Sequence, residues 1–276
     1  MSLWHLTLAT EGRQALFPDE AARRAAVRAL ASVARERLVL FSVVDDHVHL
    51  VTLGDRPGHL GRSVRLVLRP HALVPPEAAR VRPVEGRSHL ESLVRYLLGQ
   101  PVHHGIPVHP ALWTGSCFLD LAGARLLPGF RDRLPELLPR LPRSAVFRAV
   151  GLPPDAVRPA DDACIRTLGP ARLHAAATAV VGLGPVLSGR AADVVAVRAA
   201  ASALARGAGI ATAESAHAFG LPLRTVQRLA RSSIDPALSE AIRRRLTLEE
   251  SVAALPSGPY RTPETPPSLA GESDPP

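Results

Sequence analysis

Two histidines, His47 and His49, stand two positions apart in the stretch VDDHVHLV, which covers residues 44–51. In a β-strand, side chains at i and i+2 point to the same face. Both imidazoles would therefore project together, while Val48 and Leu50 point into a core. Two rings on one rigid face make half of a metal site, but they also fit the exposed face of an amphipathic strand. A third ligand would have to come from elsewhere in the chain.

A second pair of residues able to do chemistry, Tyr96 and Gln100, has the i, i+4 spacing that stacks side chains on one ridge of a helix. The ridge flanks the apolar stripe of the helix, so its side chains can reach the edge of a sheet on which the helix packs. Tyr96 is the one tyrosine outside the proline-rich C-terminal stretch. The alternative is a tyrosine at the rim of a core and a solvated glutamine.

The helix that carries this second pair is predicted over Ser88–Gln100. Ser88 and Glu91 have the spacing of a capping box at its start, and Pro101 is expected to end it. Its apolar stripe consists of Leu90, Leu93, Val94 and Leu97.

The segments before this helix alternate between strand and helix patterns. Strands are predicted over Leu3–Ala9, Arg37–Val44, His47–Leu53 and Ala79–Glu85, and helices over Asp19–Arg37 and Gly58–Leu68. A short acidic turn, Asp45-Asp46, joins the second and third strands as a hairpin. The order strand, helix, hairpin, helix, strand, helix predicts an α+β domain with an antiparallel sheet over residues 1–125.

The chain changes character beyond residue 125. Residues 126–163 form a proline-punctuated connecting region whose leucines predict short docked helices. Residues 164–252 are rich in Ala, Leu and Arg at helical spacing and predict an all-α domain. The last stretch, residues 253–276, is proline-rich and aromatic-poor, which predicts a disordered tail.

Residues 212–231 of the all-α domain fit a helix-turn-helix frame. Ala216 is small enough for the point where two helices cross, Gly220 falls in the turn, and Val226 anchors the second helix. An alanine-rich helical hairpin that binds no DNA is the alternative.

The composition favours a polyanionic partner. The net charge is +8, the pI is near 11.0, and all 33 basic residues are arginine. Guanidinium groups suit phosphate, so nucleic acid is the first candidate. The apolar runs fall short of the roughly 20 residues that a bilayer span needs, and no signal peptide is apparent. Two cysteines form no metal or disulfide pattern, so we expect a cytoplasmic protein without a membrane partner.

The motifs of residues 1–125 together resemble those of the REP-associated tyrosine transposases, a branch of the HUH single-tyrosine transposases. Members read like PNHVHLL where this chain has DDHVHLV. They read like RYIHLNPVRAGLV…YPWSSY where it has RYLLGQPVHHGIPVHPALWTGSCF, residues 95–118. The opening WHLTLATEGRQALFPDEAARR, residues 4–24, is similar to the first strand and helix of the family.

The resemblance implies a ferredoxin-like antiparallel sheet with helices on one face. It also implies that His47, His49 and Gln100 bind Mg²⁺ or Mn²⁺, which would polarise a phosphodiester of single-stranded or hairpin DNA. Tyr96 would attack that phosphate and leave a 5′-phosphotyrosine link with a free 3′-OH. Asp46 stands where relatives carry Asn. Its carboxylate would either strengthen cation binding or repel the phosphate.

The region from residue 188 onward resembles the C-terminal DNA-binding domain of the bacterial replication initiator. That resemblance implies that the second helix of the helix-turn-helix frame docks on duplex DNA. The residues expected to reach base edges are Arg224, Thr225, Gln227 and Arg228. Arg231 and the arginine run at residues 243–245 are expected to hold phosphates.

Two functions of different classes follow from these patterns. The first is a single-tyrosine transposase, or a domesticated relative, that nicks and rejoins DNA strands as a monomer or a homodimer. The second is a non-catalytic DNA-binding regulator on a degenerate scaffold of the same fold. The joint presence of all four candidate site residues favours the enzyme. An RNA-processing or structural role is disfavoured because few aromatic residues are available for base stacking.

Overall fold

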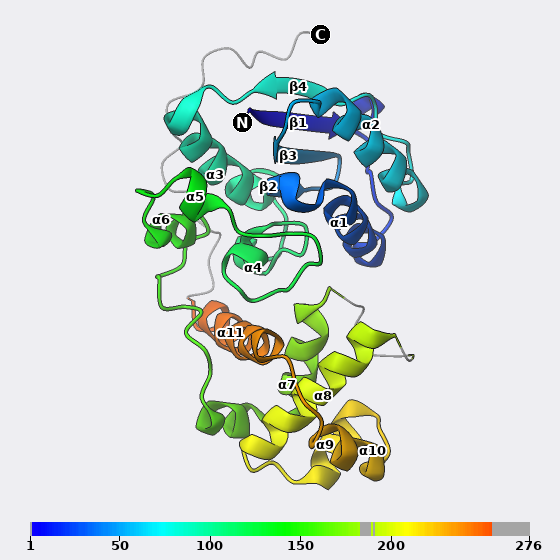
Figure 1. The fold of residues 1–276 in the computed structure, drawn as a ribbon, viewed down its shortest axis with the longest axis vertical. Coiled ribbons are helices and arrows are strands. Elements are labelled where there is room, and N and C mark those ends of the chain that lie inside the picture. Colours follow the sequence, from blue (N-terminus) through cyan, green and yellow to red (C-terminus); the bar gives the residue numbers. More distant parts are fainter. Residues whose placement is uncertain (1, 183–188, 190, 256–276) are drawn as a thin grey trace.

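The computed structural model describes residues 2–182, 189 and 191–255. Figure 1 shows an α+β part built around a sheet and, below it, a part made of helices. The mixed α+β character predicted for the first part is confirmed. Of the predicted tail, residues 256–276 lie outside the described residues.

One antiparallel sheet holds four strands in the order β2-β3-β1-β4. The strands are β1 (Leu3–Ala9), β2 (Leu38–Val43), β3 (His47–Leu53) and β4 (Arg80–Pro83). The backbone N–H of Val44 donates to the carbonyl of His47 at 3.1 Å and closes the predicted hairpin between β2 and β3. All four strands lie where the alternation of the sequence predicts them.

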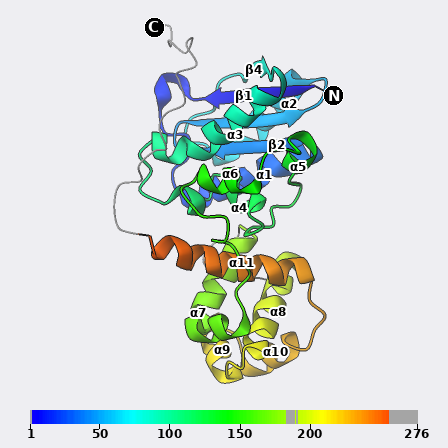
Figure 2. The same ribbon diagram turned by 90° about the vertical axis from the view of Figure 1, so that its left-hand side faces the viewer.

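Helices cover both faces of this sheet. α1 (Glu20–Ala34) and α2 (Pro57–Leu68) lie on the face that carries Leu6, whereas α3 (Gly86–His103) lies on the face that carries His49. Figure 2 shows α3 in front of the strands and α1 behind them. The expectation of helices on one face is therefore wrong. Every residue of β2 and β3 is buried, and strands whose side chains are buried on both faces need cover on both.

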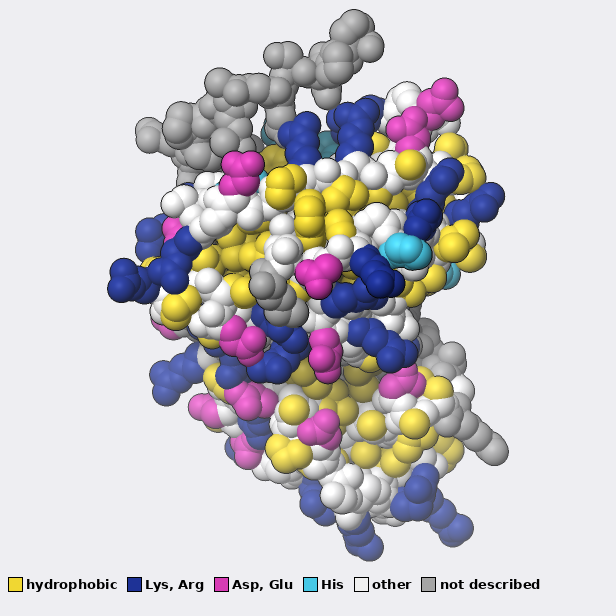
Figure 3. Space-filling model, turned by 45° about the horizontal axis from the view of Figure 1, so that its top comes forward, with side chains coloured by type: hydrophobic (Ala, Val, Ile, Leu, Met, Phe, Trp, Pro, Cys, Tyr) yellow, Lys and Arg dark blue, Asp and Glu magenta, His cyan; other side chains and the backbone are white. Residues whose placement is uncertain are grey.

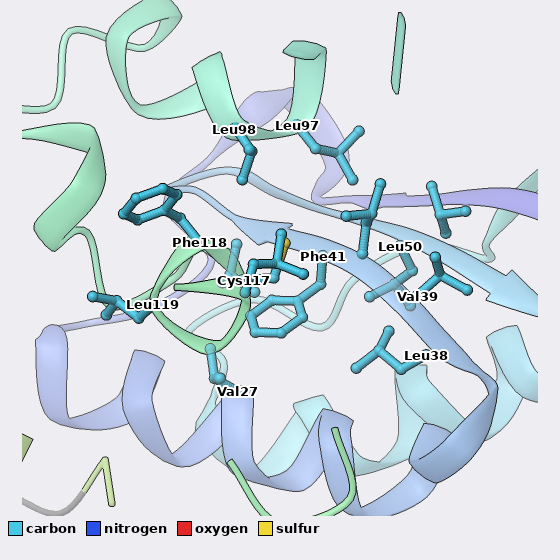
Figure 4. Packing of buried hydrophobic residues seen from close by; sticks show 14 of the residues in the cluster. Val27, Leu38, Val39, Phe41, Leu50, Leu97, Leu98, Cys117, Phe118 and Leu119 are labelled. Atoms are coloured by element: carbon cyan, nitrogen blue, oxygen red, sulfur yellow. The ribbon is translucent and has the colours of Figure 1, made fainter. Parts of the chain in front are cut away.

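Apolar side chains from both layers meet the sheet. Figure 4 shows Leu97 and Leu98 of α3 on one side of the strands and Val27 of α1 on the other. Leu97 and Leu98 are fully buried. This packing sets the position of α3 over the sheet.

The helix α3 is longer than predicted. It starts at Gly86, so Ser88 and Glu91 lie inside it and form no capping box, and it continues through Pro101 to His103. A proline inside a helix leaves one carbonyl a turn earlier without its N–H partner. The end of the helix is nevertheless closed, because the N–H of His104 donates to the Gln100 carbonyl at 3.0 Å. The consequence is one more helical turn after Gln100.

The connecting region folds onto the α+β part, as its leucines predict. Its short helices are α5 (Leu134–Leu137) and α6 (Arg143–Arg148), and another short helix, α4 (Phe118–Leu121), lies just before it in the α+β part. Phe147 packs edge-to-face on Phe118 with ring centroids 5.5 Å apart. Single 3₁₀ turns cover Glu11–Arg13, Arg35–Arg37, Arg69–His71 and Pro110–Leu112.

The helical part has its own apolar core. Its helices are α7 (Asp162–Val180), α8 (Ala192–Gly207), α9 (Thr212–Phe219), α10 (Leu223–Leu229) and α11 (Pro236–Ala253). α11 bridges the two parts, because Leu246 is buried in the helical core and Leu248 in the core of the α+β part. Among the described residues, no helix has the length and apolar character that a membrane crossing requires.

The arginine run on α11 makes contacts within the molecule and does not form an exposed surface for binding phosphates. Arg243 donates to Asp162 at 2.5 Å and to the Ala160 carbonyl at 2.6 Å. Arg244 reaches the carbonyl of Ala122 in the α+β part at 3.3 Å. Arg245 is buried and pairs with Glu249 one turn later. These arginines were expected to hold phosphates, but their side chains make internal contacts and have a structural role.

Replacing Leu97 by Ala is expected to lower the free energy of unfolding by about 2–5 kcal/mol, because it opens a cavity between α3 and the sheet. Leu66→Ala on α2 is the matched control, since Leu66 is 62% exposed, and it should change stability by at most about 0.5 kcal/mol. Urea unfolding followed by circular dichroism measures both. Equal losses for the two variants would contradict the packing of α3.

Candidate metal centre

The strand β3 turns His47 and His49 toward α3. The pairing of β1 with β3 places Thr7 opposite His49 and Leu8 opposite Val48, so the two histidines share the α3 face and Val48 lies on the other. The histidines are only 3% and 5% exposed. The i, i+2 prediction for this pair is met, but on a covered face of the sheet.

The two imidazoles aim their Nε2 atoms at each other. These atoms lie 2.8 Å apart. The outer nitrogens have other partners: His47 Nδ1 lies 2.6 Å from an Asp46 carboxylate oxygen, and His49 Nδ1 lies 3.2 Å from Thr7 Oγ1 and 3.1 Å from His5 Nε2. With Nδ1 of each ring donating outward, both inner Nε2 atoms carry lone pairs. A cation between them would satisfy both.

One ridge of α3 and its C-cap faces this histidine pair. The Tyr96 ring lies edge-on to His49 with centroids 5.3 Å apart, and His104 lies 4.9 Å from the His47 ring. Gln100 lies one turn after Tyr96 and one turn before His104, between the two contacts. Its side chain is buried, and its Oε1 has no hydrogen-bond partner among the described residues. A buried amide oxygen without a partner is costly, which marks it as a candidate ligand.

The carboxylate of Asp46 lies on the outer side of His47. Both His47 Nδ1, at 2.6 Å, and His104 Nδ1, at 3.9 Å, face its Oδ1. Arg13 contacts its other oxygen, Oδ2, at 3.5 Å. A carboxylate that accepts the Nδ1 proton of a histidine orients the ring and makes its Nε2 a better ligand. Asp46 is thus placed to support the histidine pair from the side opposite to His49.

The sequence did not point to His104. Asp46, His47 and His104 offer ligand atoms that all lie within 4.8 Å of one another, so this group could hold a metal ion. The signal was available, because His104 follows Gln100 at i+4. It was hidden by the expectation that the helix ends at Pro101. His5 and Thr7 were missed because only the strand register brings them to His49.

The electrostatics of the site favour the neutral forms of His49 and His104. Burial, and then the electrostatic interaction with His47, lowers the pKa of His49 well below its ordinary value. Burial, and then His47, also lowers the pKa of His104. For Asp46, burial raises the pKa, but the hydrogen bond and charge of His47 outweigh it and the net pKa is lowered. Neutral imidazoles and an ionised carboxylate are the forms that bind metals.

The edge strand β4 adds positive charge to the same face. In its pairing with β1, Arg82 lies opposite His5 and Arg80 opposite Thr7. Residues directly opposite in an antiparallel pair point to the same side of the sheet. Arg80 and Arg82 are both exposed, and because they stand two positions apart on β4 their side chains point to the same face. Guanidinium groups therefore lie on the face of the histidine pair, two strands away at the edge of the sheet.

The helix-turn-helix residues lie at the other end of the molecule. Gly220 takes a left-handed conformation with φ 61° between α9 and α10, as a tight turn requires, and Val226 is buried. The predicted DNA-contacting residues that are exposed are Arg224, Gln227, Arg228 and Arg231, and Thr225 is half-buried. Figure 1 shows α10 at the end of the molecule opposite the sheet, and Figure 3 shows basic side chains projecting there. The fold does not bring these residues to the histidine pair.

Comparison of the chain with family models, with curated proteins and with solved structures gives no match.

Folding stability is expected to fall as the pH drops from 6.5 toward 4, in part because of His5. Burial, then His89 and Arg82, lowers the pKa of His5 to about 4. In the unfolded chain His5 binds a proton near pH 6.5, whereas in the folded protein it does so only near pH 4. Lowering the pH between these values therefore stabilises the unfolded state relative to the folded state, and the loss of folding stability levels off below pH 4. Between pH 7 and pH 5, His5→Gln should lose about 2 kcal/mol less of its free energy of unfolding than the wild type.

Urea unfolding at the two pH values measures this difference. Leu97→Ala serves as the control, because it removes apolar contacts without removing a titrating group and should keep the pH dependence of the wild type. A pH dependence in His5→Gln as steep as that of the wild type would show that His5 is protonated in the folded state.

Proposed function

We propose that this chain is a metal-dependent DNA-nicking and rejoining enzyme of the HUH single-tyrosine transposase type, or a domesticated relative. The observation that carries the proposal is the Tyr96 ring held edge-on to His49, whose Nε2 lies 2.8 Å from that of His47. A tyrosine hydroxyl beside a candidate cation site is what attack on a phosphodiester needs. Tyr96 is 40% exposed, so substrate can reach it.

The topology is in keeping with this proposal. The element order β1, α1, β2, β3, α2, β4 is that of the ferredoxin-like motif. The strand order β2-β3-β1-β4 puts the histidine strand inside the sheet, paired on both sides. A ligand pair on an inner strand is held more rigidly than one on a loop or an edge strand.

The donor set fits the divalent ion that the resemblance implies. His47 Nε2, His49 Nε2 and the partnerless Oε1 of Gln100 would hold it, with water and phosphate oxygens as further ligands. We assign Mg²⁺ or Mn²⁺, of which Mn²⁺ better suits two imidazoles. Such an ion supplies Lewis-acid stabilisation of the charge that develops on a phosphoryl oxygen.

The chain's own residues carry the covalent step. The Tyr96 oxygen forms a bond to phosphorus, the bond from phosphorus to the 3′ oxygen breaks, and the phenol proton is balanced by the proton on the released 3′-OH. The 5′-phosphotyrosine link keeps the bond energy for rejoining, in which a 3′-OH attacks and Tyr96 leaves. Asp46 keeps His47 in the tautomer that ligates through Nε2, because it accepts from Nδ1.

The surface charge supports DNA as the substrate. Arg80 and Arg82 lie on the face of the histidine pair at the open edge of the sheet, where they can hold the phosphates of a single strand or hairpin. The exposed arginines of α10, at the other end, would dock on duplex DNA.

A non-catalytic DNA-binding regulator is the second candidate. It is favoured by one observation: α10 lies at the opposite end of the molecule from the sheet strand that carries the histidine pair, so duplex binding does not need the chemistry of the sheet. The two candidates differ in whether Tyr96 forms a covalent bond to DNA.

Incubation of the full-length protein with single-stranded hairpin DNA and Mn²⁺ is expected to give a covalent adduct on a denaturing gel. Tyr96→Phe should abolish the adduct, because it removes the attacking oxygen and keeps the ring. Tyr260→Phe, which changes the other tyrosine of the chain, is the matched control and should retain it. No adduct with any divalent ion, or an equal adduct with Tyr96→Phe, would leave the regulator as the function.

Binding to duplex DNA is expected to weaken about tenfold or more when Arg228 is replaced by Ala, since one base-contacting arginine contributes about 1–3 kcal/mol. Arg172→Ala on α7 is the control: its exposed side chain pairs with Glu250, away from α10. Fluorescence anisotropy with labelled duplex measures both. The adduct with hairpin DNA should be unchanged in Arg228→Ala, and equal affinities for the two variants would argue against α10 as the reading helix.

A further inference from the structure

The two nitrogens of His47 belong to two different groups of side chains. Its Nε2 faces His49, in the centre proposed above, at 2.8 Å. Its Nδ1 faces the Asp46 carboxylate at 2.6 Å, and His104 completes a group whose ligand atoms lie within 4.8 Å of one another. One imidazole therefore takes part in two candidate ligand sets on opposite edges of its ring.

We propose that Asp46, His47 and His104 form a second ion position that takes a borderline transition ion such as Zn²⁺. Two imidazole nitrogens and one carboxylate oxygen, with a fourth position open to water, are the donors of many zinc sites. The second position does not depend on catalysis by Tyr96. Its antagonism to the Mg²⁺ or Mn²⁺ centre, argued below, rests on the function proposed above.

The arrangement of the carboxylate suits this ion. Both histidines face the same oxygen of Asp46, Oδ1, whereas Arg13 lies at 3.5 Å from the other oxygen, Oδ2. Arg13 thus orients the carboxylate and leaves Oδ1 for the ion. Tetrahedral coordination at about 2.0–2.1 Å needs ligand atoms about 3.3 Å apart. The His47 contact must lengthen from 2.6 Å and the His104 contact shorten from 3.9 Å.

The chain can make this adjustment at His104. This residue is the C-cap of α3, its side chain is 25% exposed, and the next residue, Gly105, has φ 61°. A half-exposed ring at a helix end moves more easily than the buried rings of β3. His103, the neighbouring ring, is exposed and is not part of the ligand group.

Occupation of the second position excludes the first. An ion on His47 Nδ1 takes the lone pair there, so the proton of the neutral ring moves to Nε2. That N–H then points at His49 Nε2, 2.8 Å away, and donates a hydrogen bond to it. His47 can no longer bind an ion through Nε2. Conversely, an ion on Nε2 requires the proton on Nδ1, donated to Asp46. The ring is a two-state element whose tautomer selects the ion position.

Calorimetric titration of the full-length protein with Zn²⁺ tests the second position. His104→Ala is expected to weaken Zn²⁺ binding tenfold or more, since it removes a ligand. Asp46→Asn should act in the same direction, and circular dichroism confirms that each variant is folded. His103→Ala is the matched control and should bind as the wild type does. Gln100→Ala should also keep Zn²⁺ binding, because Gln100 belongs to the other centre.

Two results would overturn the second position: Zn²⁺ binding by His104→Ala equal to that of His103→Ala, or a loss in Gln100→Ala as large as in His104→Ala. Co²⁺, whose visible absorption reports its ligands, gives an independent readout and should lose its tetrahedral bands in His104→Ala. If no adduct forms in the hairpin assay but Zn²⁺ binding still depends on His104, the proposed function fails and the second ion position stands.

Competition between ions tests the exclusion. Bound Mn²⁺, measured by electron paramagnetic resonance, should be displaced by one equivalent of Zn²⁺ in the wild type. In His104→Ala the same amount of Zn²⁺ should displace at least tenfold less of the bound Mn²⁺. Simultaneous binding of one Mn²⁺ and one Zn²⁺ by the wild type would show that His47 serves both positions at once and would overturn the exclusion.

Discussion

The packing of α3 on the sheet is the contact on which the candidate centre depends. Leu97 and Leu98 are buried against the strands, and the residues on the neighbouring ridge are carried with them. Tyr96, Gln100 and the capping residue His104 therefore face the histidine strand because of an apolar contact that has no chemical role. Burial at this contact also lowers the pKa of His49 and so favours its neutral, metal-binding form.

The ring of His47 connects the features that surround it. Its outer nitrogen faces a carboxylate and its inner nitrogen faces His49, so the position of one proton decides which edge of the ring can bind a cation. Asp46 is thus more than a negative charge beside the histidine pair. It determines the tautomer of His47, and with His104 it offers ligands of its own.

The two parts of the molecule are joined by arginines whose partners lie on distant segments. Arg28 of α1 donates to the Val181 carbonyl at 3.1 Å and to Asp193 at 3.2 Å. Arg244 of α11 in turn donates to the carbonyl of Ala122 in the α+β part. In a chain whose basic residues are all arginine, part of the positive charge therefore serves internal contacts. Other arginines remain exposed on many elements, among them those of β4 and α10, the two places where DNA contacts are proposed.

The sequence alone determined the features that depend on short periods. The strand and helix segments, the shared face of His47 and His49, and the ridge of Tyr96 and Gln100 follow from spacings of two and four residues, which are local geometry. The tertiary structure decided the partners of these groups. The second helical layer, the place of His104 and the internal role of the arginine run depend on strand register, on a helix that continues through Pro101, and on contacts between distant segments. No local spacing encodes these contacts, because they are set by how buried surfaces fit together.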